Sequence, residues 1–398
     1  MSRIATDTAL ARVFREESGR ITASLVRILG DFDLAEEMVQ ETLVAALERW
    51  PADGIPENPG AWLTTAARRR AIDHLRRDAN YRSKLALLEE PRSALPEPDD
   101  RLRLLFTCCH PALSREAQVA LTLRTVCGLT TAQVARAFLS SEATIAQRIV
   151  RAKRKIVAAG IPYRLPSPAE SQGRVAEVLA VLYLMFNEGY LSSGDVPERR
   201  DLAEDAAWLA RLMVHLMPDE AECWGLLALM RLHIARASTR FDARGQMVLL
   251  QDQDRSRWDR RGVAEAAGML ERAARLGRIG PYQLQAAIAT VHAEARSWEE
   301  TDWAQILALY DRLVALSPSP VAALNRAIVL RQVVGAAAAL AAVDELTQPL
   351  SEYHLFHATR GELLEDLGRT KEAADARRRA LDLTVNPAER TLLLSKIR

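Results

Sequence analysis

The chain has 398 residues, of which 49% are hydrophobic and only 5% aromatic, and its formal net charge is +1. This length predicts several domains, because one domain usually contains about 100 to 200 residues. No uncharged apolar run of about 18 residues occurs, and the N-terminus lacks the apolar centre of a signal peptide, so we expect a cytoplasmic protein without membrane contact.

Two Pro-rich stretches divide the chain, EEPRSALPEPDD at residues 89–100 and IPYRLPSPAE at residues 161–170, and both are typical of extended linkers. Ala, Leu and Arg dominate the composition, which favours helices over strands and predicts an all-α fold. The domains that we expect are residues 1–78, 101–160 and 171–398, separated by linkers at 79–100 and 161–170.

The first segment predicts an acidic helix followed by a basic helix. Apolar residues recur at helical spacing and should be buried: Ala35, Met38, Val39, Thr42, Leu43, Ala46, Leu47 and Trp50. This pattern turns Glu37, Gln40, Glu41 and Glu48 outward. A turn-rich stretch at residues 51–61 ends that helix, and a second helix from Trp62 to Arg77 presents a basic face.

Residues 129–156 fit a helix-turn-helix motif. Thr130 and Gln133 form a capping box at the start of a short helix, and residues 139–141 form the turn. The longer helix that follows has an apolar stripe of Ile145, Ile149, Ala152 and Ile156. Its other face carries Gln147, Arg148, Arg151 and Arg154, as expected of a recognition helix in the major groove, although a solvated basic face remains open.

The last segment shows a repeat period near its end. Ala327 and Gly361 are 34 residues apart, as are Ala339 and Ala373. This is the period of tetratricopeptide repeats, in which small residues let paired helices approach closely. The motif NEGY at residues 187–190 has no partner at catalytic spacing, and the run at 251–260 is either a contact surface or a solvated loop with Trp258 packed inward.

The four cysteines are too few for a disulfide scaffold in a chain of this length. Cys108, Cys109 and His110 are adjacent, but no C-x-x-C or H-x-x-x-H pair completes a set of four zinc ligands. We expect buried thiols and neither a metal nor a cofactor.

Three stretches together resemble conserved regions 2 and 4 of extracytoplasmic-function (ECF) sigma factors of RNA polymerase. They are GDFDLAEEMVQETLVAALERW, NPGAWLTTAARRRAIDHLRRD and GLTTAQVARAFLSSEATIAQRIVRAKRKI. The stretches FNEGY, LLQDQDRSRWD, GPYQLQAAIATVHAEA and LNRA are similar to the group of these factors that carries a C-terminal tetratricopeptide-like extension. The resemblance implies a region 2 helical bundle, a region 4 helix-turn-helix and a helical-repeat domain.

For region 2 the resemblance implies two surfaces. The acidic helix would dock on the β′ clamp helices of core polymerase through Asp33, Glu36, Glu37, Gln40 and Glu41. The loop at residues 51–61 would receive a base flipped out of the minus-ten element, at a cost of a few kcal/mol of stacking. The residues implicated there are Asn58, Trp62, Arg68, Arg69, Arg70, Arg76 and Arg77, with Asp73 orienting the arginines.

For region 4 the resemblance implies contact with the β flap of polymerase and with the minus-thirty-five element. The predicted base contacts are Ser141, Glu142, Thr144, Gln147, Arg148 and Arg151, and the predicted phosphate contacts are Lys153 and Arg154. Two positions depart from the family pattern. Arg69 stands where Asn is common, and Leu139 stands where the turn commonly has Gly, which puts the base contact and the turn geometry in question.

The function that this implies is promoter-specific initiation of transcription by a protein that is not itself an enzyme, with the extension modulating activity or binding a protein partner. The acidic linker between Glu89 and Asp100 would either mimic nascent RNA or act as a solvated tether. Three alternatives stay open. They are a helix-turn-helix regulator with a repeat-type sensor, an interaction scaffold, and a hydrolase using Glu188 or the Cys108, Cys109 and His110 cluster.

Overall fold

The computed structural model describes residues 17–77, 100–138, 140–190, 197–242, 245–384 and 387–397. The described residues are almost entirely helical, and among them only an isolated bridge between Phe241 and Met247 has β pairing. The all-α prediction is therefore confirmed. No helix in the described ranges is long and apolar enough to cross a membrane.

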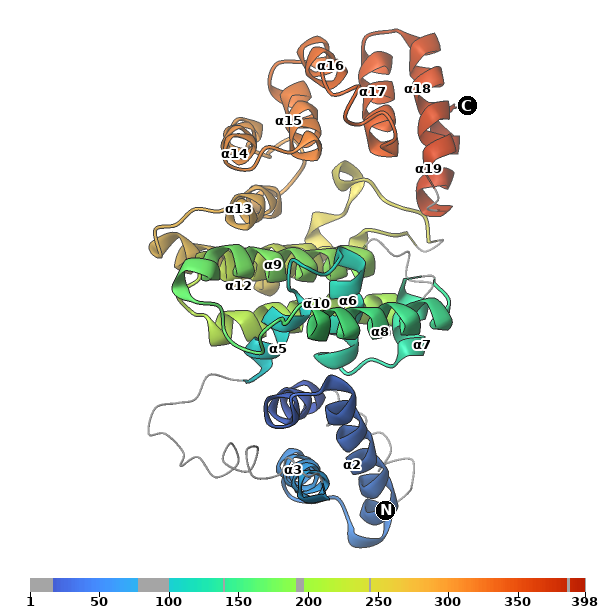
Figure 1. The fold of residues 1–398 in the computed structure, drawn as a ribbon. Helices are drawn as coiled ribbons and strands as arrows, with labels where there is room; N and C mark the ends of the chain where they lie inside the picture. Colours follow the sequence, from blue (N-terminus) through green and yellow to red (C-terminus); the bar gives the residue numbers. More distant parts are fainter. Residues whose placement is uncertain are drawn as a thin grey trace. The chain divides into compact units, whose positions relative to one another are not determined.

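The chain forms two compact units that divide within α10, the helix labelled in Figure 1. The described part of the first unit runs to Tyr190 and includes Pro197–Leu209, and that of the second begins at Ala210. This division lies beyond the Pro-rich stretch at 161–170 that suggested a boundary. The first unit contains a helix at residues 17–29 and then α2 (Phe32–Asp53), α3 (Pro59–Arg77), α5 (Asp100–Cys108), α6 (Arg115–Thr125), α7 (Thr131–Ala137), α8 (Glu142–Ala158), α9 (Pro168–Tyr190) and the start of α10 (Pro197–Leu216).

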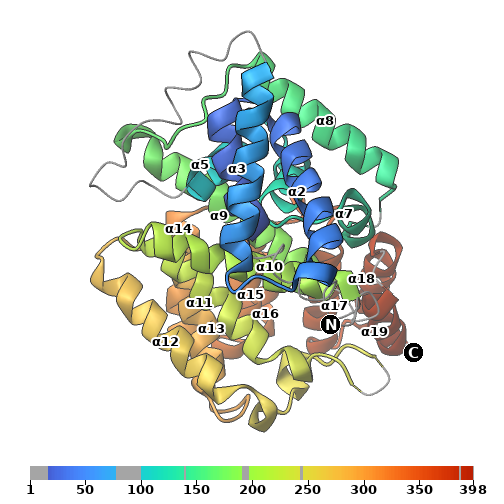
Figure 2. The ribbon, with the colours of Figure 1, turned by 90° about the horizontal axis from the view of Figure 1, so that it is seen from below.

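Helices α2 and α3 lie side by side and follow the predicted acidic and basic stretches (Figure 2). The Asp31 side chain caps α2 by accepting hydrogen bonds from the backbone N–H groups of Asp33 and Leu34. Most of the predicted stripe of α2 is buried, but Leu47 is 45% exposed. The prediction for Leu47 was wrong because it lies one residue, or about 100° around the helix, beyond the buried Ala46.

The helix-turn-helix forms as predicted in α7 and α8. Thr130 and Gln133 exchange the two hydrogen bonds of the capping box, and the Ser141 side chain caps α8 by accepting from the Thr144 N–H. All four stripe residues of α8, Ile145, Ile149, Ala152 and Ile156, are buried. Leu139, the unusual turn residue, lies outside the described residues.

Helix α9 packs on α5 and α6 and completes the core of the first unit. Its inward residues are almost fully buried: Val175, Val178, Leu179, Val181, Leu182, Met185 and Phe186. Arg115 on α6 pairs with Glu177 at 2.8 Å, and the Arg174 guanidinium donates to the Phe106 carbonyl oxygen. Helix α9, which follows the Pro-rich stretch at 161–170, thus belongs to the same compact unit as the helix-turn-helix.

The second unit continues with α11 (Ala221–Ala235), η1 (Ala237–Thr239), η2 (Leu250–Asp252), η3 (Arg255–Arg257), α12 (Arg260–Arg275) and α13 (Pro281–Glu294). The stretch GPYQ starts α13. The Glu222 carboxylate accepts hydrogen bonds from the Tyr282 and Gln283 N–H groups at 2.9 and 3.1 Å, which satisfies two donors of that helix end. An added Cβ on Gly280 would overlap the Glu222 side chain, so this capping requires glycine there.

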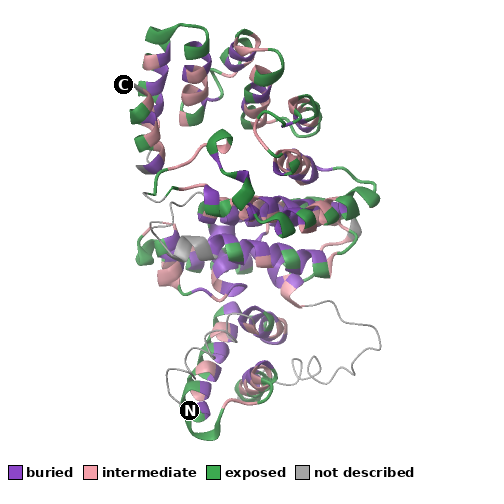
Figure 3. Ribbon diagram, turned by 180° about the vertical axis from the view of Figure 1, so that it is seen from behind, coloured by how far each residue is buried: buried purple, intermediate pink, exposed green. Residues whose placement is uncertain are grey.

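The remaining helices form antiparallel pairs with one buried and one exposed face (Figure 3). They are α14 (Trp303–Leu316), α15 (Pro320–Val333), α16 (Ala336–Asp344), α17 (His354–Asp366), α18 (Thr370–Leu383) and α19 (Pro387–Ile397). The pair α15 and α16 recurs as α17 and α18 at an offset of 34 residues, because 354 − 320 and 370 − 336 both equal 34. Ala327, Ala339 and Ala373 are at most 1% exposed within one apolar cluster.

The charged run at 251–260 is held inward by two residues rather than by Trp258 alone. Trp258 is 4% exposed and its indole N–H donates to the Thr239 hydroxyl at 2.9 Å. Arg255 is 5% exposed, and its guanidinium donates to the carbonyl oxygens of His292 and Ala295 at 2.9 and 3.0 Å. The motif therefore anchors a loop to the end of α13.

Candidate nucleic-acid interface

The basic face of α3 is open to solvent. Arg68, Arg69 and Arg76 are exposed, whereas Arg70 is half-buried and pairs with Glu41 of α2 at 3.6 Å. Arg76 pairs with Asp73 at 3.7 Å with both side chains more than half exposed, so this pair leaves the guanidinium accessible. The Arg77 side chain lies outside the described residues. A surface of this kind can bind phosphates.

The loop before α3 is organised by Asn58 and Trp62. Asn58 is exposed, and its side-chain oxygen accepts a hydrogen bond from the Ala61 N–H at 3.0 Å, so this residue caps the basic helix. Trp62 is half-buried and meets the buried Trp50 edge to face, with 5.6 Å between ring centroids. Trp62 therefore packs at the helix start.

The predicted reading face of α8 is largely exposed. Ser141, Glu142, Thr144, Gln147, Arg151 and Arg154 are all solvent-exposed, opposite the buried stripe. Arg148 is half-buried and lines a cavity of about 230 Å³ together with Phe138 of the turn and Leu184 and Glu188 of α9. Glu188 of the NEGY motif thus lies beside the recognition helix.

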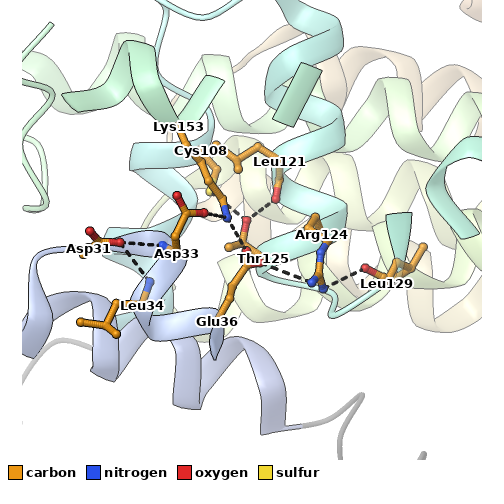
Figure 4. A network of polar contacts seen from close by, with 10 residues as sticks. All are labelled: Asp31, Asp33, Leu34, Glu36, Cys108, Leu121, Arg124, Thr125, Leu129 and Lys153. Carbon is orange, nitrogen blue, oxygen red and sulfur yellow. Dashed lines mark hydrogen bonds and ion pairs between the residues drawn. The ribbon is translucent and has the colours of Figure 1, made fainter. Parts of the chain in front are cut away.

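Lys153 does not lie on this exposed face. It is 7% exposed, and its ammonium group pairs with the Asp33 and Glu36 carboxylates of α2 at 2.8 and 3.1 Å (Figure 4). Arg124 of α6 pairs with the same Glu36 at 3.3 Å. In this arrangement Lys153 contacts acidic side chains of α2 and lies with the buried stripe of α8 rather than on its exposed face.

The same contacts divide the predicted polymerase-docking residues into two sets. Glu37, Gln40 and Glu41 are exposed, whereas the Glu36 side chain is only 17% exposed and faces α6 and α8. The 80%-exposed Asp33 side chain lies at the edge of this cluster. Two exposed apolar residues lie beside this set on α2: Val44, at 53% exposure, for which the sequence analysis made no prediction, and Leu47, at 45%, which was predicted to be buried.

The sequence does contain a pattern that indicates the inward position of the charged side chains of Lys153 and Glu36. Lys153 lies four residues after Ile149 and three before Ile156, and Glu36 lies four after Phe32 and three before Val39. Each charge therefore occupies a position on an apolar stripe. Opposite charges at stripe positions of two helices indicate an ion pair between those helices.

The cysteines next to this cluster are buried and protonated. Cys108 and Cys109 are 0% exposed, and the Cys109 sulfur lies 3.5 Å from the Thr122 hydroxyl. Burial raises the pKa of Cys109 to about 12 and raises that of Cys108 further. Over the described ranges, no group of three or more His, Cys, Asp or Glu side chains is arranged to hold a metal ion.

Comparison with known proteins agrees with this geometry. Residues 13–81 match the family Sigma-70 region 2 and residues 103–156 match Sigma-70, region 4. Residues 174–274 match a family of unknown function, DUF6596, which begins in α9 and ends in α12. These matches define the chain as a protein with the two regions of a sigma-70 factor followed by a helical extension.

Two relatives make the assignment more specific. The ECF RNA polymerase sigma factor SigL of Mycobacterium tuberculosis is 30% identical over 159 residues, which cover 38% of this chain and 89% of SigL. An uncharacterized protein of Rhizobium meliloti is 46% identical over 380 residues, or 92% of this chain and 90% of that protein, so it shares the extension. The chain belongs to the ECF sigma factors of the sigma-70 family, with a C-terminal helical extension.

Proposed function

We propose that this sigma factor binds core RNA polymerase and directs initiation at promoters by reading the minus-ten and minus-thirty-five elements. The observation that carries the proposal is the presence, in one unit, of an exposed acidic surface on α2 and of exposed arginine-rich surfaces on α3 and α8. A protein that bridges polymerase and DNA needs surfaces of both signs, because DNA contacts require cations.

Docking on the β′ clamp helices is assigned to Glu37, Gln40 and Glu41, with the exposed Val44 and Leu47 supplying apolar contact area. This composition supports docking on a protein rather than on DNA, since carboxylates repel phosphates while charged rims and apolar centres are typical of protein interfaces. Region 4 would dock on the β flap.

Minus-ten recognition is assigned to α3 and the loop before it. The residues that would bind strand phosphates are Arg68, Arg69, Arg76 and Arg77. The Arg70 guanidinium pairs with Glu41 instead, and Asp73 would orient Arg76. Asn58 is assigned to the pocket for a flipped base while its side-chain oxygen caps α3. Trp62 supports that loop by packing on Trp50.

Minus-thirty-five recognition is assigned to the exposed face of α8. Ser141, Glu142, Thr144, Gln147 and Arg151 would contact base edges, Arg148 would do so from beside α9, and Arg154 would bind phosphate. The capping of α8 by Ser141 supports this assignment, because it fixes the N-terminal end that enters the groove. The C-terminal helical unit is assigned a modulating role.

The test is promoter-dependent transcription with purified core polymerase and the full chain. We expect Glu37→Lys with Gln40→Lys to lose polymerase binding, since one cation would replace an exposed carboxylate and a second would replace a neutral side chain on the same face. Glu271→Lys on α12, whose side chain is 73% exposed, is the matched control and should bind and transcribe normally. Promoter binding without any polymerase binding would refute the proposal and favour a helix-turn-helix regulator.

A further inference from the structure

Arg148 of the recognition helix lines two cavities of the first unit. One cavity, of about 400 Å³, is also lined by Thr144, Gln147 and Arg151, which are assigned to base contacts. The other, of about 230 Å³, is also lined by Glu188 of α9. The Arg148 side chain therefore lies between the reading face of α8 and the first helix of the extension.

Helix α9 is anchored against α6, and its last turn is well packed. The Arg115 guanidinium of α6 pairs with the Glu177 carboxylate at 2.8 Å and donates to the Glu177 carbonyl oxygen at 3.2 Å. Near the end of α9 the rings of Phe186 and Tyr190 stack with 5.3 Å between their centroids, and Phe186 is 0% exposed. Glu188 lies between these two aromatic residues in the sequence, so the backbone that carries it has a defined position in the unit.

The cavity that Arg148 and Glu188 share has mostly apolar walls, which come from α6, α8, α9 and the turn of the helix-turn-helix. The apolar residues that line it are Val119, Ala120, Phe138, Ile145 and Leu184. Opposite charges beside apolar walls attract each other more strongly than in open water, because the effective dielectric constant is lower. Arg148 is half-buried there and Glu188 is exposed.

The other two charged residues of this cavity already have partners. The Arg115 guanidinium is paired with a carboxylate of α9. Hydrogen bonds from its own backbone N–H and from Ser114 lower the pKa of Glu116, and the nearby Arg148 guanidinium lowers it as well. Among the described residues, neither Arg148 nor Glu188 forms an ion pair, so the Glu188 carboxylate remains available to the Arg148 guanidinium.

A carboxylate behind an arginine changes how that arginine reads DNA. A guanidinium recognises guanine with two parallel N–H groups that donate to O6 and N7, and it carries five N–H donors in total. A fixed carboxylate can accept hydrogen bonds from the remaining donors and hold the guanidinium plane in register with the base. Without such a partner the long side chain can also bind phosphates, which adds affinity but no sequence information.

We propose that Glu188 is a positioning residue for Arg148 and that α9 is thereby part of the minus-thirty-five reading site. The Glu188 carboxylate accepts hydrogen bonds from the side of the Arg148 guanidinium that faces α9, which leaves the other donors for a guanine in the major groove. The extension thus determines the preference for one base pair of the promoter. This inference rests on the proposed function, because it requires α8 to read the minus-thirty-five element.

The test is selection, by core polymerase carrying the full chain, from promoter duplexes randomised across the minus-thirty-five element. Arg148→Ala should lose a guanine preference at one position. Glu188→Gln should weaken the preference at that same position by roughly three- to fivefold, the upper part of the range for exposed ion pairs, and leave the other positions unchanged. Glu188→Asp keeps the charge and should retain more of the preference than Glu188→Gln.

The matched control is Glu271→Gln on α12, which removes a 73%-exposed carboxylate from the second unit and should give the wild-type profile. Thermal unfolding should be the same in Glu188→Gln as in wild type, because Glu188 is exposed. Binding to DNA that lacks the element should stay at the wild-type level or rise, since the substitution removes a negative charge. A parallel fall on both kinds of DNA would indicate a merely structural role and overturn the inference.

Combining the substitutions tests whether the two residues act together. In the Arg148→Ala background, Glu188→Gln should have no further effect on the profile, because the residue that it positions is gone. A wild-type profile in Glu188→Gln, or a change only at positions that Arg148→Ala leaves intact, would overturn the inference and leave the proposed function standing. Absence of any base preference in the wild-type protein would refute the proposed function, and the inference with it.

Discussion

Arginines on α3 and α8 of the first unit and several arginines on the repeat helices of the second unit differ in their contacts. On α3 and α8 several point to solvent, including Arg69, Arg151 and Arg154. In the repeat helices they connect one helix to another: Arg331 pairs with Asp366 and Arg360 with Asp344. A net charge of +1 therefore combines an exposed cationic surface with an internally neutralised one. The number of basic residues says little about nucleic-acid binding until their partners are known.

The largest predicted effect concerns where the first unit ends. A chain ending at Leu165 lacks α9 and exposes the α5 and α6 surfaces that it covers. Burying one large apolar side chain contributes about 1.5 to 3 kcal/mol, and α9 buries Leu179, Leu182, Met185 and Phe186 among others. Their loss is comparable with the whole stability of a domain, about 5 to 15 kcal/mol.

We therefore expect the chain ending at Leu165 to be aggregated or without a cooperative thermal transition. A chain ending at Leu216, which keeps α9 and α10, is the control and should melt cooperatively when followed by circular dichroism. A stable, cooperative protein ending at Leu165 would show that the helix-turn-helix unit is complete without α9.

The second prediction targets an arginine that holds helices together. Arg377 on α18 is 8% exposed, and its guanidinium pairs with Glu362 and Glu365 of α17 at 3.3 and 3.1 Å and donates to the Lys396 carbonyl oxygen of α19. Arg377→Met should destabilise the second unit by about 2 to 3 kcal/mol, less than a fully buried pair because both carboxylates are partly exposed. Chemical denaturation measures this, and Arg378→Met, at an exposed neighbour, should change little.

The third prediction is a pH dependence of the stability of the second unit. Burial, followed by the nearby Arg236 and Arg255, lowers the pKa of His292 to about 4, against about 6.5 in the unfolded chain. Between these two pKa values the unfolded state binds more protons than the folded state. The free energy of unfolding is therefore highest above pH 6.5 and falls as the pH decreases toward 4, by up to about 3 kcal/mol. Burial lowers the pKa of His233 as well, which adds to the same loss.

His292→Phe keeps a ring between Trp298 and Trp303 and should reduce the slope of unfolding free energy against pH without abolishing it. Denaturation at pH 7 and pH 5 measures the slope. An equal slope in wild type and variant would contradict the role of His292.

The sequence predicted features that depend on local periodicity and missed features that depend on contact between regions. The α8 stripe and the Thr130 capping box are local, and both were correct. Lys153 was assigned to phosphate binding because it lies in a basic helix. Its ion-pair partner Asp33 is 120 residues away in the sequence, so the local pattern around Lys153 does not identify that partner. Leu47 was predicted to be buried because it continues the apolar pattern of α2. How wide a stripe is actually buried depends on which elements pack against the helix, and the sequence of one helix does not show this. The packing of α9 was hidden by the Pro-rich stretch before it, which suggested a boundary.

The smallest predicted effect compares the two kinds of arginine directly. Arg151 is exposed on α8, so Arg151→Ala should leave the unfolding free energy within about 0.5 kcal/mol of wild type. If Arg151 binds bases or phosphate, promoter affinity should fall by about 1 to 3 kcal/mol, and loss of a phosphate contact would lower the salt slope by about 1. Arg377→Met should show the reverse, with altered stability and unchanged DNA affinity. An Arg151→Ala protein that loses stability but binds DNA normally would place Arg151 with the structural arginines, and the division between the two units would then not reflect function.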